Sequence, residues 1–247
     1  MFTENEFSGY GEETVKHDGI VVKIVQDDGS CESPREWDNL GTIATWHRRY
    51  NLGDEQPNSS PIEHMADLIS EYNPKIHDII EYYEDEYFNR VTKDMEFGSK
   101  EIQQKIAEID RIINDRIQTE FDKYFISLPV YMYEHSGITI STGGFSCSWD
   151  SGQLGFIYVS KADIRKEYGW KNITKKRIAQ IAKYLDGEIK VYDQYLVGDV
   201  WGFQIGNYNE YGEFNCMDSC YGFYGREYAI EEAVSMANYI INEKVTA

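Results

Sequence analysis

Two apolar series that flank a Gly-Ser pair constrain the fold of this chain most strongly. In both series the apolar residues recur at spacings of three and four, which is the period of an amphipathic helix. The first series comprises Ile76, Ile79, Ile80, Tyr83, Tyr87 and Val91, and the second comprises Ile102, Ile106, Ile109, Ile113, Ile117, Phe121 and Phe125. Gly98 suits a helix C-cap, Ser99 suits an N-cap, and Pro74 suits the first turn of the earlier helix. The pattern predicts an antiparallel αα-hairpin within residues 61–125.

The second helix of this hairpin would be long for a domain of this size. At about 1.5 Å for each residue it would measure roughly 40 Å. We therefore expect the hairpin to project as an arm or to serve as a dimerisation surface, which would make the protein a homodimer.

Short strand patterns on both sides of the hairpin predict an α+β fold. Residues 20–25 form a β-branched run that ends at a turn, and several short strand patterns follow Pro129. Helical patterns begin at Thr174 and span residues 229–243. Strands with helices between them and turn-linked neighbours indicate an antiparallel-rich sheet with flanking helices and a long inserted αα-hairpin.

The expected domain organisation follows from these patterns. Residues 1–18 are acidic and contain glycines, which favours a loose acidic arm. Residues 19–60 and 126–247 are expected to form the α+β core, with residues 61–125 as the helical hairpin insertion. Residues 192–203, rich in aromatics and carboxylates, are interpreted as a half-buried strand. The alternative for that segment is an aromatic platform on which a base or nucleotide stacks.

The composition is strongly acidic. The chain holds 43 acidic and 24 basic residues, for a formal net charge of −19, and 15% of its residues are aromatic. Disordered acidic tails are poor in aromatics, so this composition indicates a folded acidic protein. Direct binding of nucleic acid is disfavoured because phosphate recognition needs clustered lysine and arginine. A partner protein with a basic surface, including one that itself binds nucleic acid, is favoured instead.

The acidic residues concentrate in the helical region. Residues 54–122 hold 18 acidic and 7 basic residues, whereas residues 161–190 hold 4 acidic and 9 basic residues. One interpretation is two solvated helix faces and an intramolecular attraction. The other is a negative rod that occupies a nucleic-acid groove on a partner, since duplex DNA carries about one charge per 1.7 Å of axis. The partner-binding residues expected on this acidic hairpin are Asp78, Glu81, Glu84, Asp85, Glu86, Glu108 and Asp115.

Three segments place Trp-Asp or Asp-Ser pairs close to the start of a strand pattern. The order Phe-x-Cys, Asp-Ser, Gly-Phe occurs in residues 145–156 and again in residues 214–223, and Trp37–Gly41 is a third relative. Aspartates in such places commonly cap their own turn. Alternatively, the aspartates of the three segments converge to bind a nucleotide-like small molecule or a divalent ion. The residues of these candidate ligand loops are Trp37, Asp38, His47, Trp149, Asp150, Gln153 and Asp218.

No catalytic or metal-binding motif is apparent. The histidines show no His-Glu-x-x-His spacing, and neither a Gly-rich phosphate loop nor a Gly-x-Ser-x-Gly elbow occurs. His47 beside Arg48 and Arg49 is weak evidence for a catalytic base, because no partner that would orient it is identifiable. We therefore expect no cofactor and no metal, and a binding protein before an enzyme.

The chain is expected to be cytoplasmic. Its first residues show no basic segment followed by an apolar run, and no stretch approaches the roughly 20 apolar residues that a membrane helix needs. The cysteines are sparse and are expected to be reduced thiols rather than a disulfide framework. They are Cys31, Cys147, Cys216 and Cys220.

Several blocks of the sequence resemble those of a family of phage and mobile-element proteins of unassigned function. The opening blocks are Ser33–Thr42, with Trp-Asp-Asn-Leu-Gly-Thr, and Trp46–Asp54. Later blocks are Phe145–Val159, with Trp-Asp-Ser-Gly-Gln-x-Gly, then Asp193–Gly202 and Asp218–Gly225. The resemblance covers about a third of the chain, leaves out the central helical region and implies no catalytic residues. It implies a phage-encoded accessory protein that acts in the host cell cytoplasm.

These observations lead to one functional hypothesis and two alternatives. The hypothesis is an accessory binding protein that inhibits a host defence or nucleic-acid-binding protein through an acidic surface that mimics nucleic acid. By analogy, such counter-defence proteins include anti-CRISPR and anti-restriction proteins. The first alternative is a nucleotide-like ligand or divalent-ion binder, including an enzyme, that uses the Trp-Asp and Asp-Ser loops. The second is a phage assembly component.

Overall fold

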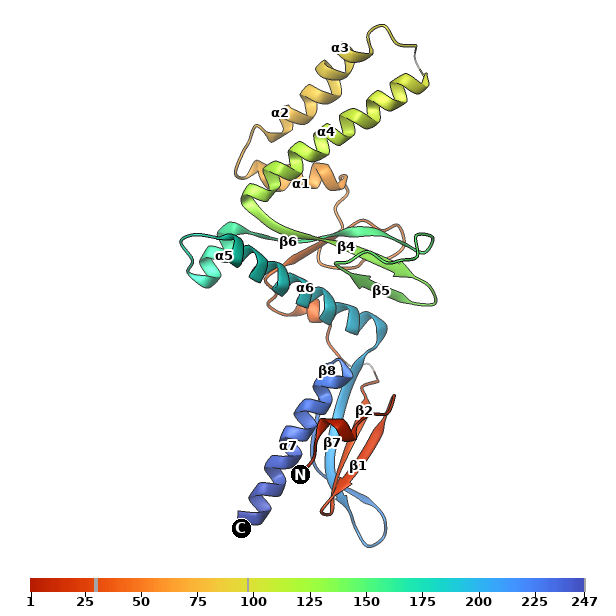
Figure 1. Cartoon of the computed structure of the whole chain (residues 1–247), viewed down its shortest axis with the longest axis vertical. Coiled ribbons are helices and arrows are strands. Elements are labelled where there is room, and N and C mark those ends of the chain that lie inside the picture. Colours follow the sequence, from red (N-terminus) through yellow and green to blue (C-terminus); the bar gives the residue numbers. More distant parts are fainter. Residues whose placement is uncertain (29–30, 97, 247) are drawn as a thin grey trace. The chain divides into compact units, whose positions relative to one another are not determined.

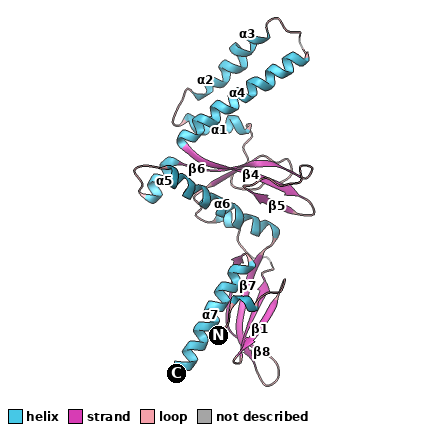
Figure 2. Cartoon of the chain, viewed as in Figure 1, coloured by secondary structure: helices cyan, strands magenta, loops and turns pink. Residues whose placement is uncertain are grey.

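The computed structural model describes residues 1–28, 31–96 and 98–246, and the chain divides into two compact units. Unit 1 comprises Met1–Asp38, Tyr133–Ser141 and Glu188–Ala247, and unit 2 comprises Asn39–Met132 and Thr142–Gly187. Helices and antiparallel strands make up most of the described residues (Figure 1, Figure 2), which confirms the predicted α+β class. The core that the sequence predicts as one body is thus divided between two units.

Unit 1 is built on a four-stranded antiparallel sheet in the order β1-β2-β7-β8. The strands are β1 (Glu13–His17), β2 (Ile20–Gln26), β7 (Val200–Tyr208) and β8 (Phe214–Tyr224), and the helix α7 (Arg226–Thr246) follows. In the register of the sheet, Phe203 of β7 lies opposite Ile24 of β2 and opposite Cys220 of β8. The strand β8 is a terminal strand of this sheet.

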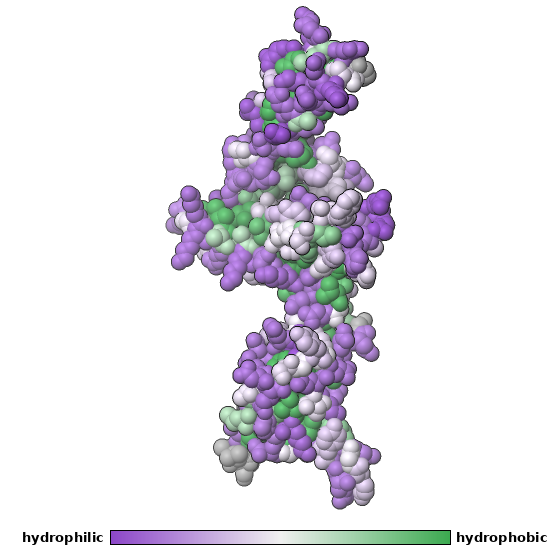
Figure 3. All heavy atoms as spheres, turned by 45° about the vertical axis from the view of Figure 1, so that its right-hand side comes forward, coloured by the Kyte–Doolittle hydropathy of each residue, from purple (hydrophilic) through white to green (hydrophobic). Residues whose placement is uncertain are grey.

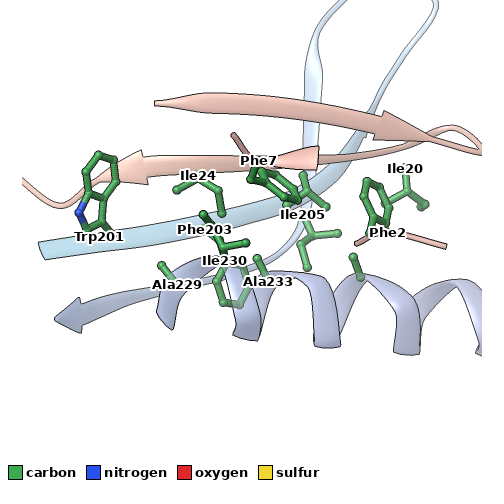
Figure 4. Close-up of a cluster of buried hydrophobic side chains, with 12 residues drawn as sticks. Phe2, Phe7, Ile20, Ile24, Trp201, Phe203, Ile205, Ala229, Ile230 and Ala233 are labelled. Carbon is green, nitrogen blue, oxygen red and sulfur yellow. The ribbon is translucent and has the colours of Figure 1, made fainter. Parts of the chain in front are cut away.

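Helix α7 covers one face of the sheet, and the core of unit 1 lies between them (Figure 4). Alternate residues of β2 and β7 point toward the helix, as the two-residue period of a strand requires. The helix meets them with Ala229, Ala233 and Ala237, all fully buried at a spacing of four. Their small side chains let the helix backbone approach the sheet closely. The larger residues of this cluster include Ile20, Val22, Ile24, Trp201, Phe203, Ile205 and Ile230.

The N-terminal segment packs against the same core, so the loose arm predicted for residues 1–18 is wrong. Phe2 and Phe7 are only 2% and 4% exposed and belong to the core cluster. The Phe2 amide donates to the side-chain oxygen of Asn238 over 2.7 Å, and the Asn238 side chain donates to the Phe2 carbonyl over 2.9 Å. Burial of these two aromatic side chains therefore holds the segment on the core, although its acidic composition is typical of a loose arm.

The other sheet has the strand order β3-β6-β4-β5. The strands are β3 (Thr42–Thr45), β4 (Phe125–Glu134), β5 (Ile138–Ser141) and β6 (Ser151–Ser160), and the helices α5 (Lys161–Tyr168) and α6 (Lys175–Val197) follow β6. Gly155 is required where β6 pairs with β3, because a Cβ at this position would lie 1.9 Å from the carbonyl oxygen of Ala44. The glycine of the first Gly-Phe pair therefore serves strand packing.

The predicted αα-hairpin is confirmed, and it belongs to unit 2 (Figure 1). Its elements are α1 (Pro61–Ser70), α2 (Ile76–Glu81), the π-helical segment η3 (Tyr82–Tyr87), α3 (Phe88–Thr92) and α4 (Lys100–Tyr124). Ser99 caps α4, since its hydroxyl accepts a hydrogen bond from the Ile102 amide over 3.3 Å. Gly98 adopts a φ of +79°, which favours glycine. The short π-helix in the first arm is not predicted by the periodicity.

The base of the hairpin packs onto strands β3 and β6. Helices α1 and α4 bury apolar side chains against β3 and β6 in one cluster. Ile117 and Phe121 of α4 are fully buried there, whereas Ile106, further along the same helix, is 44% exposed. The apolar period therefore continues beyond the part of the helix that the sheet covers. The cluster includes Ala44, Met65, Ala66, Ile69, Ile109, Ile113, Ile117, Phe121, Phe125, Phe156 and Tyr158.

Two local predictions are wrong. Residues 192–197, interpreted as strand, continue helix α6, because Ile181, Leu185, Ile189 and Tyr192 recur at helical spacing and all four are buried. The Asp-Ser pair at Asp218, predicted as a turn before a strand, lies inside the long strand β8. In both cases pairing or packing with distant residues overrides the local pattern.

Candidate protein-binding groove

The two units differ strongly in charge. Unit 1 holds 21 acidic and 6 basic residues, a net charge of −15, and unit 2 holds 22 acidic and 18 basic residues, a net charge of −4. Most of the negative excess therefore belongs to unit 1. This distribution is hidden in the linear sequence, because unit 1 is assembled from three separate segments.

Within residues 54–122, acidic residues outnumber basic ones mainly before and within the first arm of the hairpin, which α2, η3 and α3 form. Residues 54–86 hold ten acidic residues and one lysine. Hydrophilic side chains cover much of this region on the face drawn in Figure 3. Among the expected partner-binding residues, five lie on α2 and η3 and all five are exposed. They are Asp78, Glu81, Glu84, Asp85 and Glu86.

Helix α4, the second arm, is close to neutral. It holds six acidic and five basic residues. Glu108 forms an ion pair with Lys105 at 2.5 Å, and Asp115 is exposed. Glu120 is paired with Lys123, and this hydrogen bond lowers the pKa of Glu120 and raises the pKa of Lys123. The long helix expected to form a negative rod thus carries its own counter-charges.

The candidate ligand loops are built mainly as turns and packing contacts. His47 accepts hydrogen bonds at Nδ1 from the amides of Arg49 and Tyr50, at 3.3 and 3.2 Å, and its ring stacks on Tyr50 with 5.0 Å between centroids. Trp37 packs edge-on against Tyr224 at 5.2 Å, while Trp149 is 94% exposed. The contacts of His47 therefore order this loop.

The aspartates of these loops occupy different settings. Asp38 and Asp218 belong to unit 1, and Asp150 belongs to unit 2. Asp150 lies 3.8 Å from the thiol of Cys147, and the Gln153 side chain donates to the Gly155 carbonyl over 3.3 Å. Within the described part of the chain, no group of three or more His, Cys, Asp or Glu residues is placed to hold a metal ion. Convergence of the three aspartates stays a prediction.

A groove in unit 1 lies between the terminal strand β8 and helix α7. Asp218 and Cys220 lie opposite Ile205 and Phe203 of β7, so their side chains share the face that α7 covers. The helix lines the groove with residues spaced as i, i+3, i+4 and i+7, which form one stripe. The groove has a volume of about 530 Å³. Its lining is Phe203, Asp218, Ser219, Cys220, Phe223, Glu232, Ser235, Met236 and Tyr239.

The groove combines apolar surface with negative charge. Phe203 and Phe223 stack at its base, with ring centroids 5.6 Å apart. On its helical side, Met236 and Tyr239 are 37% and 58% exposed, so the groove presents large apolar side chains to solvent. Asp218 and Glu232 supply the carboxylates, one from each element. A segment with basic and apolar side chains fits this combination.

A second hollow of unit 1 holds an internal contact. It measures about 460 Å³ and is lined by the N-terminal segment and the start of α7. The guanidinium of Arg226 donates to Glu13 over 2.8 Å and to the Gly11 carbonyl over 3.0 Å, and it stacks over Trp201 at 5.6 Å. These contacts hold the N-terminal segment in place, so the groove at β8 is the stronger candidate site.

Sequence reasoning singled out Asp218 but missed the other groove residues. The stripe of Glu232, Ser235, Met236 and Tyr239 was readable as one edge of the final amphipathic helix. A second signal was available in β8, whose Phe214–Tyr224 segment has no lysine, arginine or proline. Neither signal indicates that the two elements are neighbours.

Comparison with known proteins identifies no similar protein. No protein-family model, no curated protein and no solved structure matches this chain. Among the described residues, no helix has the length and apolar character needed to cross a membrane.

Proposed function

We propose that this chain is a binding protein that captures a basic protein partner in the groove between β8 and α7. The observation that carries the proposal is the groove itself, which joins Asp218 and Glu232 to exposed apolar side chains. It lies on the unit with a net charge of −15.

Charge and apolar surface have different tasks in this proposal. The field of an acidic unit attracts a basic partner over distances up to the Debye length, about 10 Å at moderate salt, and speeds association. The apolar residues Met236, Tyr239 and Phe223 then hold the partner once water is displaced. Affinity should therefore decrease with salt without disappearing.

The partner class follows from the same chemistry. Proteins that bind nucleic acid carry clustered lysine and arginine, and an acidic protein that occupies such a surface inhibits them by competition. The resemblance of several sequence blocks to phage and mobile-element proteins supports a role as a phage accessory protein directed at a host defence or nucleic-acid-binding protein. On this proposal it acts in the host cytoplasm and needs neither cofactor nor metal.

A second candidate function is nucleic-acid mimicry by the helical region. The observation that favours it is the run of ten acidic residues against one lysine in residues 54–86. The exposed carboxylates of α2 and η3 would then meet the basic groove of the partner. The near neutrality of α4 makes this surface narrower than a duplex-like rod, and we rank it below the groove.

Two matched variants test these functions against each other. The groove variant carries Asp218→Lys and Glu232→Lys, and the helix variant carries Asp78→Lys, Glu81→Lys and Asp85→Lys. Proteins retained from a host lysate at low salt would be identified, purified and titrated individually against wild type and both variants. Circular dichroism would verify that each variant is folded.

We expect a purified basic partner whose affinity falls in the groove variant and in high salt but persists in the helix variant. Loss of binding only in the helix variant would support nucleic-acid mimicry instead. An affinity that changes neither with the salt concentration nor in the groove variant would refute the proposed function.

A further inference from the structure

The strand that forms one wall of the groove is a long terminal strand of its sheet. Strand β8 is eleven residues long and terminal in its sheet. Seven of its residues are exposed. Natural edge strands are commonly protected by lysine, proline, β-bulges, inward-pointing charges or short length, because an open edge pairs with other chains. The register between β7 and β8 shifts twice, between Trp201 and Phe203 and between Ile205 and Gly206. Among the eleven residues of β8 the only charged one is Asp218, and there is no proline.

Two backbone amides of β8 donate to carboxylates. The Ser219 amide donates to Asp218 over 2.8 Å, and the Gly222 amide donates to Asp27 over 3.1 Å. A carboxylate is a substitute for the carbonyl oxygen that a neighbouring strand would supply. Asp218 therefore satisfies an amide of β8 and lines the groove with the same side chain.

We propose that a basic, extended segment of the partner adds to the sheet of unit 1 as a strand beside β8. Its carbonyl oxygens accept hydrogen bonds from β8, one of them in place of Asp218 at the Ser219 amide. The released carboxylate of Asp218 then pairs with a lysine or arginine side chain of the segment. This inference rests on the proposed function, because it specifies how the partner occupies the same groove.

The two faces of β8 suit a strand with alternating side chains. On the face that α7 covers, every second side chain of the segment reaches the groove, with its carboxylates and exposed Met236. On the other face, Tyr221 lies flat over Gly202, where a Cβ would be 2.3 Å from its ring. The Tyr221 hydroxyl accepts a hydrogen bond from Gln204 over 2.7 Å, and the residue is 46% exposed. Each face thus offers apolar contacts, and the groove face adds the carboxylates of Asp218 and Glu232.

The negative charge of unit 1 favours a basic partner segment over a second copy of this chain beside β8. A second copy of this chain would bring another unit with a net charge of −15 to the same edge, and like charges at an interface oppose association. A basic strand lowers this repulsion instead. Main-chain hydrogen bonds supply affinity in strand addition, and alternate side-chain pockets supply specificity.

The experiment uses a peptide of alternating arginine and valine, about as long as β8 and blocked at both ends. Its affinity for the full chain would be measured by fluorescence polarisation. A matched peptide with methylated backbone amides keeps the charges and side chains but cannot form the ladder. Hydrogen exchange of residues 214–224 would be followed with and without the peptide, with the hairpin arm, residues 76–92, as the internal control.

We expect the methylated peptide to bind at least about tenfold more weakly, since several hydrogen bonds are lost. Exchange in β8 should slow on binding of the parent peptide, while exchange in residues 76–92 stays unchanged. Equal affinity of the two peptides, unchanged exchange in β8, or no binding of the parent peptide would overturn strand addition. None of these outcomes removes the proposed function, which is tested by the salt and charge dependence of a protein partner.

Discussion

The carboxylate of Asp218 accepts a hydrogen bond from the backbone amide of Ser219 over 2.8 Å, within an exposed terminal strand. The substitution Asp218→Asn keeps an oxygen acceptor at this position and removes the charge. We expect the affinity for the arginine-valine peptide to fall by a factor of about 1.4 to 5 at low salt, in line with about 0.2–1 kcal/mol for an exposed ion pair. Fluorescence polarisation measures the change.

The control is a peptide with glutamine in place of arginine. Its affinity should be the same for wild type and Asp218→Asn, because it brings no cation to the carboxylate. An equal loss for both peptides would show that Asp218 acts on the strand itself rather than on charge recognition.

The cysteines report occupancy of the groove. Cys216 and Cys220 are exposed on β8, and Cys220 lines the groove. Cys31 is only partly exposed, and its thiol donates to Asp27 over 3.0 Å. We expect iodoacetamide to modify the two β8 cysteines faster than Cys31, as followed by mass spectrometry. The arginine-valine peptide should slow modification of Cys220 and leave that of Cys147 unchanged; equal protection of both residues would argue against binding at this edge.

The thiol of Cys31 makes the stability of unit 1 sensitive to alkaline pH. Burial, and then the neighbouring Asp27, raise its pKa to about 11. An unfolded cysteine titrates at about 8.5. Because the folded pKa is the higher one, the stabilisation is complete below about pH 8.5 and is lost as pH rises toward the folded value.

This dependence of stability on pH can be measured below about pH 10, because the tyrosines of unfolded chains titrate at about that pH. The pKa of Tyr224 is raised to about 12, chiefly by burial, so its own contribution declines only at higher pH. Urea unfolding between about pH 8.5 and 10 should show a falling free energy of unfolding for wild type. Cys31→Ser should remove this component of the slope, and an unchanged slope would contradict the assignment.

A buried ion pair lies within unit 1. The guanidinium of Arg35 lies 3.0 Å from a carboxylate oxygen of Glu188, and the two side chains are only 6% and 7% exposed. Removing one charge of such a pair typically costs about 3–5 kcal/mol, because the other stays buried. We expect that loss of unfolding free energy for Glu188→Ala in urea titrations. The double variant Arg35→Met, Glu188→Leu should be closer to wild type, and a double variant less stable than Glu188→Ala would contradict this account.

The hairpin is stabilised by its base. Phe121 is fully buried and stacks on Phe125 with 4.4 Å between ring centroids. We expect Phe121→Ala to lower the free energy of unfolding by about 3–5 kcal/mol. Ile106→Ala, at a position 44% exposed on the same helix, should change it by only about 0.5 kcal/mol. Denaturation followed by circular dichroism measures both, and similar costs at the two positions would show that the outer hairpin is packed as tightly as its base.

Local periodicity was sufficient to predict the hairpin and the α+β class. Residues at spacings of three and four must share a helix face, and a buried face of that kind is visible without any knowledge of its partner. The turn at Gly98 and Ser99 is equally local, since a positive φ and a hydroxyl cap depend on the residues themselves. The net charge is also a property of composition alone.

Only the tertiary structure decided where that charge lies and what it surrounds. Three segments far apart in the chain assemble unit 1, so its net charge of −15 cannot be read from a sliding window. Burial of Phe2 and Phe7, which show no period, depends on a core supplied by β2, β7 and α7. The groove depends on a helical stripe and a strand face that are each visible in sequence. Their adjacency is set by long-range packing, which short-range residue spacing does not encode.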